Sequence, residues 1–117
     1  MAVQPIILTP DLDRVQAFYT QVLGAVEVFR HPADGPVFYK TLQIGDGQLG
    51  LVAKESDVSV PARIVLSIGV EDVDAVLPLV EAAGGRVQGP ANDMPWGQRV
   101  AHVLDPDGNP VNLTQDL

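Results

Sequence analysis

The sequence predicts an α+β protein built from two copies of a βαβββ module. Three observations support this class: a strand-turn-strand pattern near the C-terminus, an amphipathic helix pattern after an apolar strand near the N-terminus, and a repetition of the whole pattern at an offset of about sixty residues. Each module should form a mixed sheet with its helix on the outside. Two such sheets facing each other would form a cup with a cleft, where a ligand pocket is expected.

The strongest local pattern is the turn at residues 105–110, Asp-Pro-Asp-Gly-Asn-Pro, between two alternating apolar stretches. Proline suits the second position of a turn and glycine permits positive φ, so a hairpin is predicted. Alternation sorts the side chains onto two faces. One face is apolar and consists of Ala101, Val103, Val111 and Leu113; the other is mixed and consists of Val100, His102, Asn112 and Thr114.

The first half shows the remaining elements of a module. Apolar residues spaced three and four apart predict a helix that begins at Pro10-Asp11 and ends before Gly24. Strands are expected at residues 3–9, 25–30, 37–44 and 48–53, with a loop at 31–36.

The same order recurs after a short polar connector. We expect one domain over residues 1–117, with module 1 at about 1–54, a linker at about 55–60 and module 2 at about 61–117. Pro78 lies inside the second predicted helix, where it should bend the helix or limit it to a first turn and a packed segment after it.

Composition limits the partners. Fifteen acidic and seven basic residues give a net charge of −8, which disfavours nucleic acid and anionic membranes and would attract a cationic ligand, although acidity can also serve solubility alone. The chain has no cysteine, so it offers no disulfide or thiolate chemistry. Without a signal-peptide pattern or a long apolar stretch, a cytoplasmic location is expected.

Several motifs together resemble a known family. The doubled module, the stretch 11–24 (DLDRVQAFYTQVLG), and Trp96-Gly97 leading into the Asp-Pro-Asp-Gly-Asn turn are similar to the vicinal oxygen chelate superfamily. That superfamily includes glyoxalase I, bleomycin-resistance proteins, fosfomycin-resistance enzymes and extradiol dioxygenases. The resemblance implies the cup-shaped fold and a homodimer, and it says little about the reaction.

Metal-dependent members place ligands at four positions, and the motifs carry these over to Gln4, Gly50, Arg63 and Asn112. Gly50 offers no donor, Arg63 would place a cation where a cation should bind, and two amides are weak ligands. We therefore expect no catalytic metal and no other cofactor.

Other residues could contact a ligand or act chemically. His102 could act as a base or simply bond a neighbour, and Trp96 could stack on a planar or cationic ligand or pack locally. Phe38 could line the cleft or pack in the core. Arg63 could bind an anionic group or pair with an acid. Asp105 and Asp107 should bond their own turn.

The resulting hypothesis is a protein similar to the bleomycin-resistance binding proteins. It would sequester a small cationic or aromatic molecule in a dimer cleft through Trp96, His102, Phe38, Arg63, Gln4 and Asn112. The alternative is a metal-independent or atypical lyase, isomerase or dioxygenase that uses His102. A structural or regulatory module with an unused cleft is the third possibility.

Overall fold

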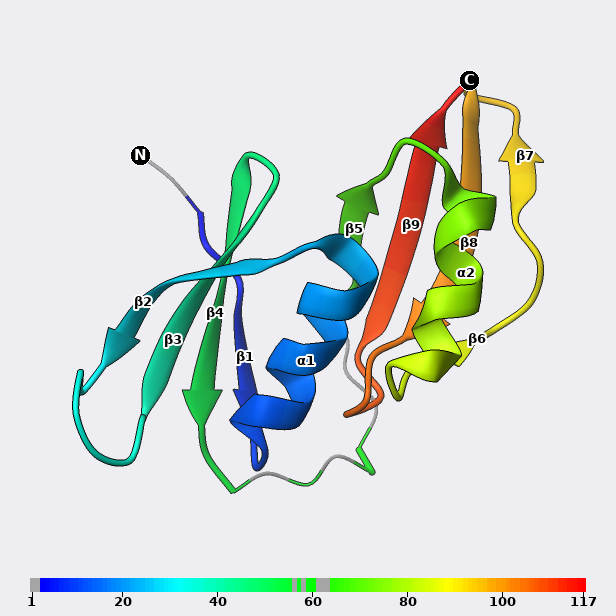
Figure 1. Cartoon of the computed structure of the whole chain (residues 1–117). Helices are drawn as coiled ribbons and strands as arrows, with labels where there is room; N and C mark the ends of the chain where they lie inside the picture. The colour runs from blue at the N-terminus through cyan, green and yellow to red at the C-terminus, as the bar shows by residue number, and fades with distance from the viewer. Residues whose placement is uncertain (1–2, 56, 58, 61–63) are drawn as a thin grey trace. The chain divides into compact units, whose positions relative to one another are not determined.

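A computed structural model describes residues 3–55, 57, 59–60 and 64–117, and Arg63 therefore lies outside the described residues. The chain divides into two compact units, Met1–Asp57 and Val58–Leu117 (Figure 1). The first unit contains β1 (Ile6–Thr9), α1 (Leu12–Leu23), β2 (Val26–His31), β3 (Tyr39–Ile44) and β4 (Gly47–Ala53). Its sheet has the order β1-β4-β3-β2, with β1 parallel to β4 and the other pairs antiparallel.

The second unit repeats this arrangement. It contains β5 (Leu66–Gly69), α2 (Val73–Ala82), β6 (Arg86–Val87), β7 (Asn92–Met94), β8 (Gln98–Leu104) and β9 (Pro110–Asp116). The sheet order is β5-β9-β8-β6, and β7 also pairs with β8. The predicted α+β class and the doubled βαβββ module are confirmed.

Each helix is capped at its start by an aspartate. Asp11 accepts a hydrogen bond from the backbone N–H of Arg14, and Asp72 accepts one from that of Ala75. Each carboxylate thus satisfies an N–H group that has no partner within its helix. Helix α1 ends at Gly24, whose φ of 67° suits glycine, as the sequence predicts.

One face of each sheet is covered by the helix of its own unit. In the second unit the predicted apolar face is confirmed, since Ala101 pairs with Leu113, Val103 pairs with Val111, and all four are at most 1% exposed. In the first unit Leu42, Leu49 and Leu51 are buried in the same way. Burial of these side chains is the main stabilising contribution in each unit.

Three local expectations need correction. Strand β1 begins at Ile6 rather than residue 3, because Pro5 has no N–H to donate to a ladder. Helix α2 runs without interruption from Val73 to Ala82 and contains Pro78, so of the two expected effects of this proline the limit to a first turn is wrong. The strand after α2 is split into β6 and β7, with Pro90 between them. Within the described residues, neither helix has the length and apolar character needed to cross a bilayer.

Candidate functional site

The sheet face of the first unit that points away from α1 carries several exposed apolar side chains. Strand register places one row of residues across the sheet, because Ile6 pairs with Gly50, Gly50 with Thr41, and Thr41 with Phe29. A second row contains Leu8, Val52 and Tyr39. We call these two rows the open face of the first unit. Ile6, Leu8 and Phe29 are 51%, 48% and 53% exposed, which is unusual for large apolar side chains.

Gly50 lies at the centre of the open face, and the ring of Tyr39 lies against it. A Cβ atom built on Gly50 would lie 3.1 Å from the Tyr39 hydroxyl oxygen, 3.3 Å from Tyr39 Cε2 and 3.0 Å from Ile6 Cγ1. These separations are too short for ordinary contacts. The Tyr39 ring therefore occupies space that a side chain at position 50 would otherwise fill.

The Tyr39 hydroxyl belongs to a directed chain of hydrogen bonds. Thr41 Oγ1 donates to the Tyr39 hydroxyl at 3.1 Å, and that hydroxyl donates to Gln4 Oε1 at 3.2 Å. We call these three residues the Gln4–Tyr39–Thr41 cluster. Of the site residues predicted from the sequence, Gln4 belongs to this cluster. Tyr39 and Thr41 were missed, although alternation along their strand places them on one face.

In the second unit the corresponding row brings two predicted residues together. Ser67 pairs with Asn112, and Asn112 pairs with His102. His102 Nδ1 lies 2.7 Å from Asn112 Oδ1, and the imidazole is exposed. Because an amide oxygen can only accept, Nδ1 carries the proton in this contact, and in the neutral ring Nε2 is then an acceptor. Such an imidazole could accept a proton from a ligand.

Trp96 and Phe38 are both exposed, at 68% and 56% respectively. Trp96 lies in the turn between β7 and β8, and its indole N–H donates to Gln98 Oε1 at 3.0 Å. Phe38 directly precedes β3, and packing in the core is excluded for it by its exposure. Both rings are accessible in their own units, so each remains a candidate ligand contact.

A family model described as the glyoxalase/bleomycin resistance protein/dioxygenase superfamily matches residues 2–113. The chain belongs to this superfamily. The resemblance inferred from the sequence motifs is thereby confirmed.

Curated relatives carry names of enzymes. "Putative glyoxylase CFP32" of Mycobacterium bovis is 32% identical over 102 residues, covering 87% of this chain and 39% of that protein. The chain thus spans about two fifths of the length of that relative. "Probable lactoylglutathione lyase" of Vibrio parahaemolyticus is 32% identical over 91% of this chain and 83% of its own.

Solved structures of the same fold include proteins with other names. TioX from Micromonospora sp. ML1 has a TM-score of 0.76 at 25% identity, covering 99% of this chain and 100% of its own. The bleomycin resistance determinant encoded on transposon Tn5 has a TM-score of 0.72 at 24% identity, covering 99% and 98%. The latter likeness shows the fold alone, and the superfamily's names span both binding and catalysis.

Metal-dependent members of the superfamily need a set of strong donors, and the described residues here do not supply one. At the carried-over positions Gly50 has no donor, Gln4 Oε1 already accepts from Tyr39, and Asn112 Oδ1 lies against His102. A divalent metal in such a site prefers imidazole, thiolate or carboxylate ligands. In the part of the chain that the structure describes, no group of three such side chains lies close enough to hold a metal.

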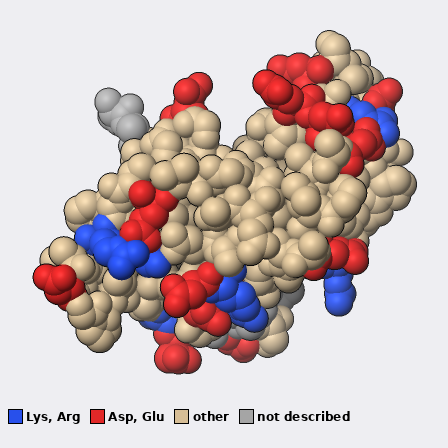
Figure 2. Space-filling view, in the orientation of Figure 1, with Lys and Arg blue, Asp and Glu red and all other residues tan. Residues whose placement is uncertain are grey.

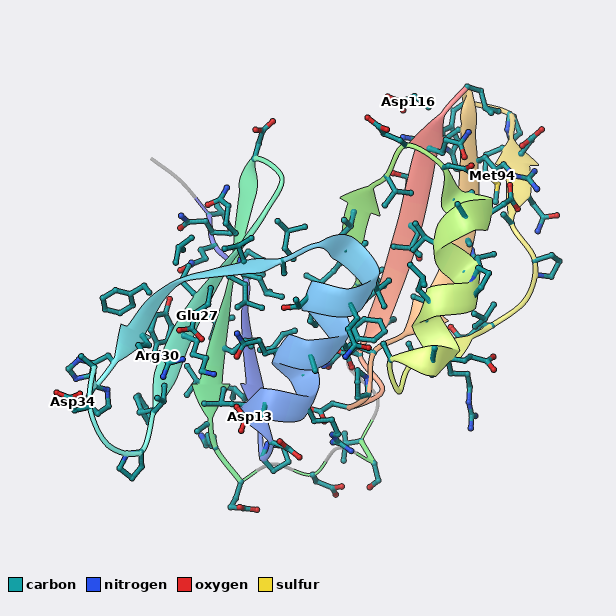
Figure 3. The ribbon with its side chains drawn as sticks, viewed as in Figure 1. Asp13, Glu27, Arg30, Asp34, Met94 and Asp116 are labelled. Atoms are coloured by element: carbon teal, nitrogen blue, oxygen red, sulfur yellow. The ribbon has the colours of Figure 1, made fainter. Side chains whose placement is uncertain are left out.

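One cluster of charged residues in the first unit lies on the helix side of the sheet. Figure 3 shows Glu27 and Arg30 side by side, with Asp13 at the start of α1. Arg30 donates two hydrogen bonds to Glu27, and the buried Lys40 ammonium contacts Gln16 Oε1 at 2.5 Å and Glu27 Oε1 at 3.3 Å. Hydrogen bonds from Arg30, then from Gln16 and Lys40, lower the pKa of Glu27 to about 2 against the opposing effect of burial.

Acidic side chains of the second unit gather at the end where the chain terminates (Figure 2). Arg99 there forms a two-bond contact with Asp74 and a third contact with Asp93 at 3.0 Å. The neighbouring Arg99 guanidinium lowers the pKa of Asp74. These carboxylates are exposed and partly neutralised, which is typical of a solvated surface network.

Proposed function

We propose that the protein binds a small cationic or aromatic molecule on its open sheet surfaces without the help of a catalytic metal. The observation that carries this proposal is the position of Tyr39 against Gly50. Where a metal-dependent member would have a ligand, this chain has an aromatic ring and a hydroxyl group, which suit contact with an organic molecule. Binding of this kind requires no transfer of electrons or protons.

The character of the exposed residues supports the same proposal. Large apolar side chains at the surface of a unit mark a binding or assembly surface more often than an ordinary solvated one. Phe29 and Tyr39 form a tilted aromatic pair with ring centroids 6.0 Å apart. In the second unit Trp96 is exposed, and in both units such rings could stack on a flat ligand.

We also propose a homodimer, in which part of this apolar surface is covered by a second copy. Exposed side chains in both units, such as Ile6 and Ile64 at 51% and 77%, are better covered than left in water. Ligand-binding clefts would then be completed by the partner.

A ligand screen by thermal shift, in buffer with and without EDTA, tests the proposal. A molecule present at 100 times its Kd should stabilise the folded chain by about 2.7 kcal/mol, and EDTA should not change that gain. A hit that stabilises only when divalent metal is present would contradict a metal-free site.

The alternative is catalysis by His102, which the names of the curated relatives and the free Nε2 atom favour. A neutral imidazole whose Nδ1 proton is held by Asn112 presents Nε2 as a candidate general base. Product formed from a hit of the screen by the wild type, and lost in His102→Ala with affinity retained, would establish this alternative. Unchanged ligand recovered after prolonged incubation would support binding alone.

A further inference from the structure

On the basis of the proposed function, we infer that the Gln4–Tyr39–Thr41 cluster selects an uncharged, flat ligand that carries a hydrogen-bond acceptor such as a carbonyl group. The inference concerns the open face of the first unit. It narrows the ligand class that composition alone suggested.

The direction of the hydrogen bonds fixes what the cluster can offer. Thr41 donates to Tyr39, and Tyr39 donates to Gln4 Oε1. One acceptor site of the Gln4 amide oxygen is therefore used within the protein, whereas its two Nε2 protons have no partner among the described residues. Water can bond to this half-exposed amide in the free protein. A ligand that covers the amide and displaces that water has to offer an acceptor in its place, because a buried N–H group without a partner costs binding energy.

The absence of charged side chains from the described β1, β3 and β4 rows of the open face favours an uncharged ligand group over a charged one. Among the described residues on the β1, β3 and β4 rows of the open face, none is Asp, Glu, Lys or Arg, and His31 lies only at the end of β2 on the same side. A ligand carboxylate would be desolvated there without a cation to pair with it. A ligand ammonium group would meet N–H donors and no carboxylate. An uncharged carbonyl avoids both costs.

The shape of the surface favours a planar molecule. Gly50 leaves the centre of the sheet without a projecting side chain, and the Tyr39 ring lies over it. Phe29, tilted by 59° to that ring, and the half-exposed Ile6 supply apolar contact area on either side. A flat aromatic ring can stack against such a surface with little loss of its own conformational freedom.

Three probes that share one ring system test the inference by titration calorimetry at fixed salt. They are 2-acetylnaphthalene, which is an uncharged ketone, 2-naphthoate, which is an anion, and 2-naphthylmethylammonium, which is a cation. The ketone should bind at least about tenfold more tightly than either charged probe, the order expected when a donor is satisfied without burying a charge. Charged probes that bind as tightly as the ketone would overturn the inference.

Variants then assign the preference to the cluster. Gln4→Met keeps the length of the side chain and should reduce ketone affinity by about tenfold, while Tyr39→Phe should reduce it less by releasing the Gln4 amide from its fixed orientation. Gln48→Met is the matched control, because Gln48 lies on the same side of β4 and its amide already donates to Gln43 at 3.1 Å. Ketone affinity should be unchanged in this control.

The outcomes separate the inference from the proposed function. Ketone binding that survives Gln4→Met, with the fold intact by circular dichroism, overturns the role of the cluster and leaves metal-free binding standing. Screen hits together with no measurable binding of any naphthalene probe also overturn the inference alone. If neither screen hits nor probes bind, both the inference and the proposed function are wrong.

Discussion

Replacing Gly50 with Ala is the most direct perturbation of the open face. The new Cβ atom would approach Tyr39 and Ile6 at 3.0–3.3 Å, and two of these neighbours, the hydroxyl oxygen and Cε2 of Tyr39, belong to one rigid phenol group. Overpacking of this kind costs about 1–3 kcal/mol, whereas replacing glycine in a compatible backbone conformation stabilises by about 0.4–1 kcal/mol through the unfolded chain. We therefore expect Gly50→Ala to lower the free energy of unfolding by about 1–2 kcal/mol.

Gly47→Ala is the matched control in the same strand. Gly47 also lies in β4, its φ is not positive, and the nearest atom to an added Cβ is Ile44 O at 3.6 Å, an ordinary contact. This variant should be neutral or slightly stabilised. Both variants should be compared with the wild type by thermal unfolding followed by circular dichroism, because the single tryptophan, Trp96, lies in the other unit. A Gly50→Ala protein as stable as Gly47→Ala would refute the close approach of Tyr39.

Three further predictions concern other parts of the chain. The pKa of Glu27 in the folded chain is lowered to about 2 from 4.5, so its stabilising contribution is present above pH 4.5 and is lost as the pH falls toward 2. The free energy of unfolding, measured from pH 6 to 2, should therefore decline less steeply for Glu27→Gln than for the wild type. Asp105 accepts hydrogen bonds from the backbone of Asp107 and from the backbone and side chain of Asn109. In urea unfolding, Asp105→Ala should therefore lower the free energy of unfolding by about 2–3 kcal/mol. The control Asp46→Ala, at an exposed position, should change it by less than about 0.5 kcal/mol. Light scattering at micromolar concentration should give about twice the chain mass of 12.5 kDa, and a monomer at every concentration would contradict the dimer.

Local patterns predicted most of the fold. The turn at residues 105–110 and the alternation on either side of it predicted a hairpin with Ala101 and Leu113 on one face and His102 and Asn112 on the other, and these residues pair in the observed register. The start of α1 at Pro10-Asp11 was predictable for the same reason: caps, turns and alternation are encoded within a few residues. The start of β1 and the continuity of α2 were less predictable. For α2 the reason is that tertiary packing can override the effect of a proline inside a helix.

The candidate site was only partly predictable because its key contact is not local. Gln4 precedes β1, whereas Tyr39 lies in β3 and Gly50 in β4, and their proximity depends on a register that sequence alone does not fix. Sequence reasoning identified Gln4 and Gly50 as poor metal ligands but had no means to place a tyrosine against the glycine. The net charge of −8 likewise describes the whole chain and not the open face, where the described strand residues other than His31 are uncharged.

The central claim, binding of an organic molecule without a catalytic metal, is tested most directly by one titration. Wild-type protein freed of metal by EDTA and dialysis should be titrated with 2-acetylnaphthalene, and the titration repeated after addition of one equivalent of zinc, nickel or manganese. We predict the same Kd in all four cases, and no heat of metal binding at the site. Ketone binding that appears only after one of these metals has bound would contradict the claim.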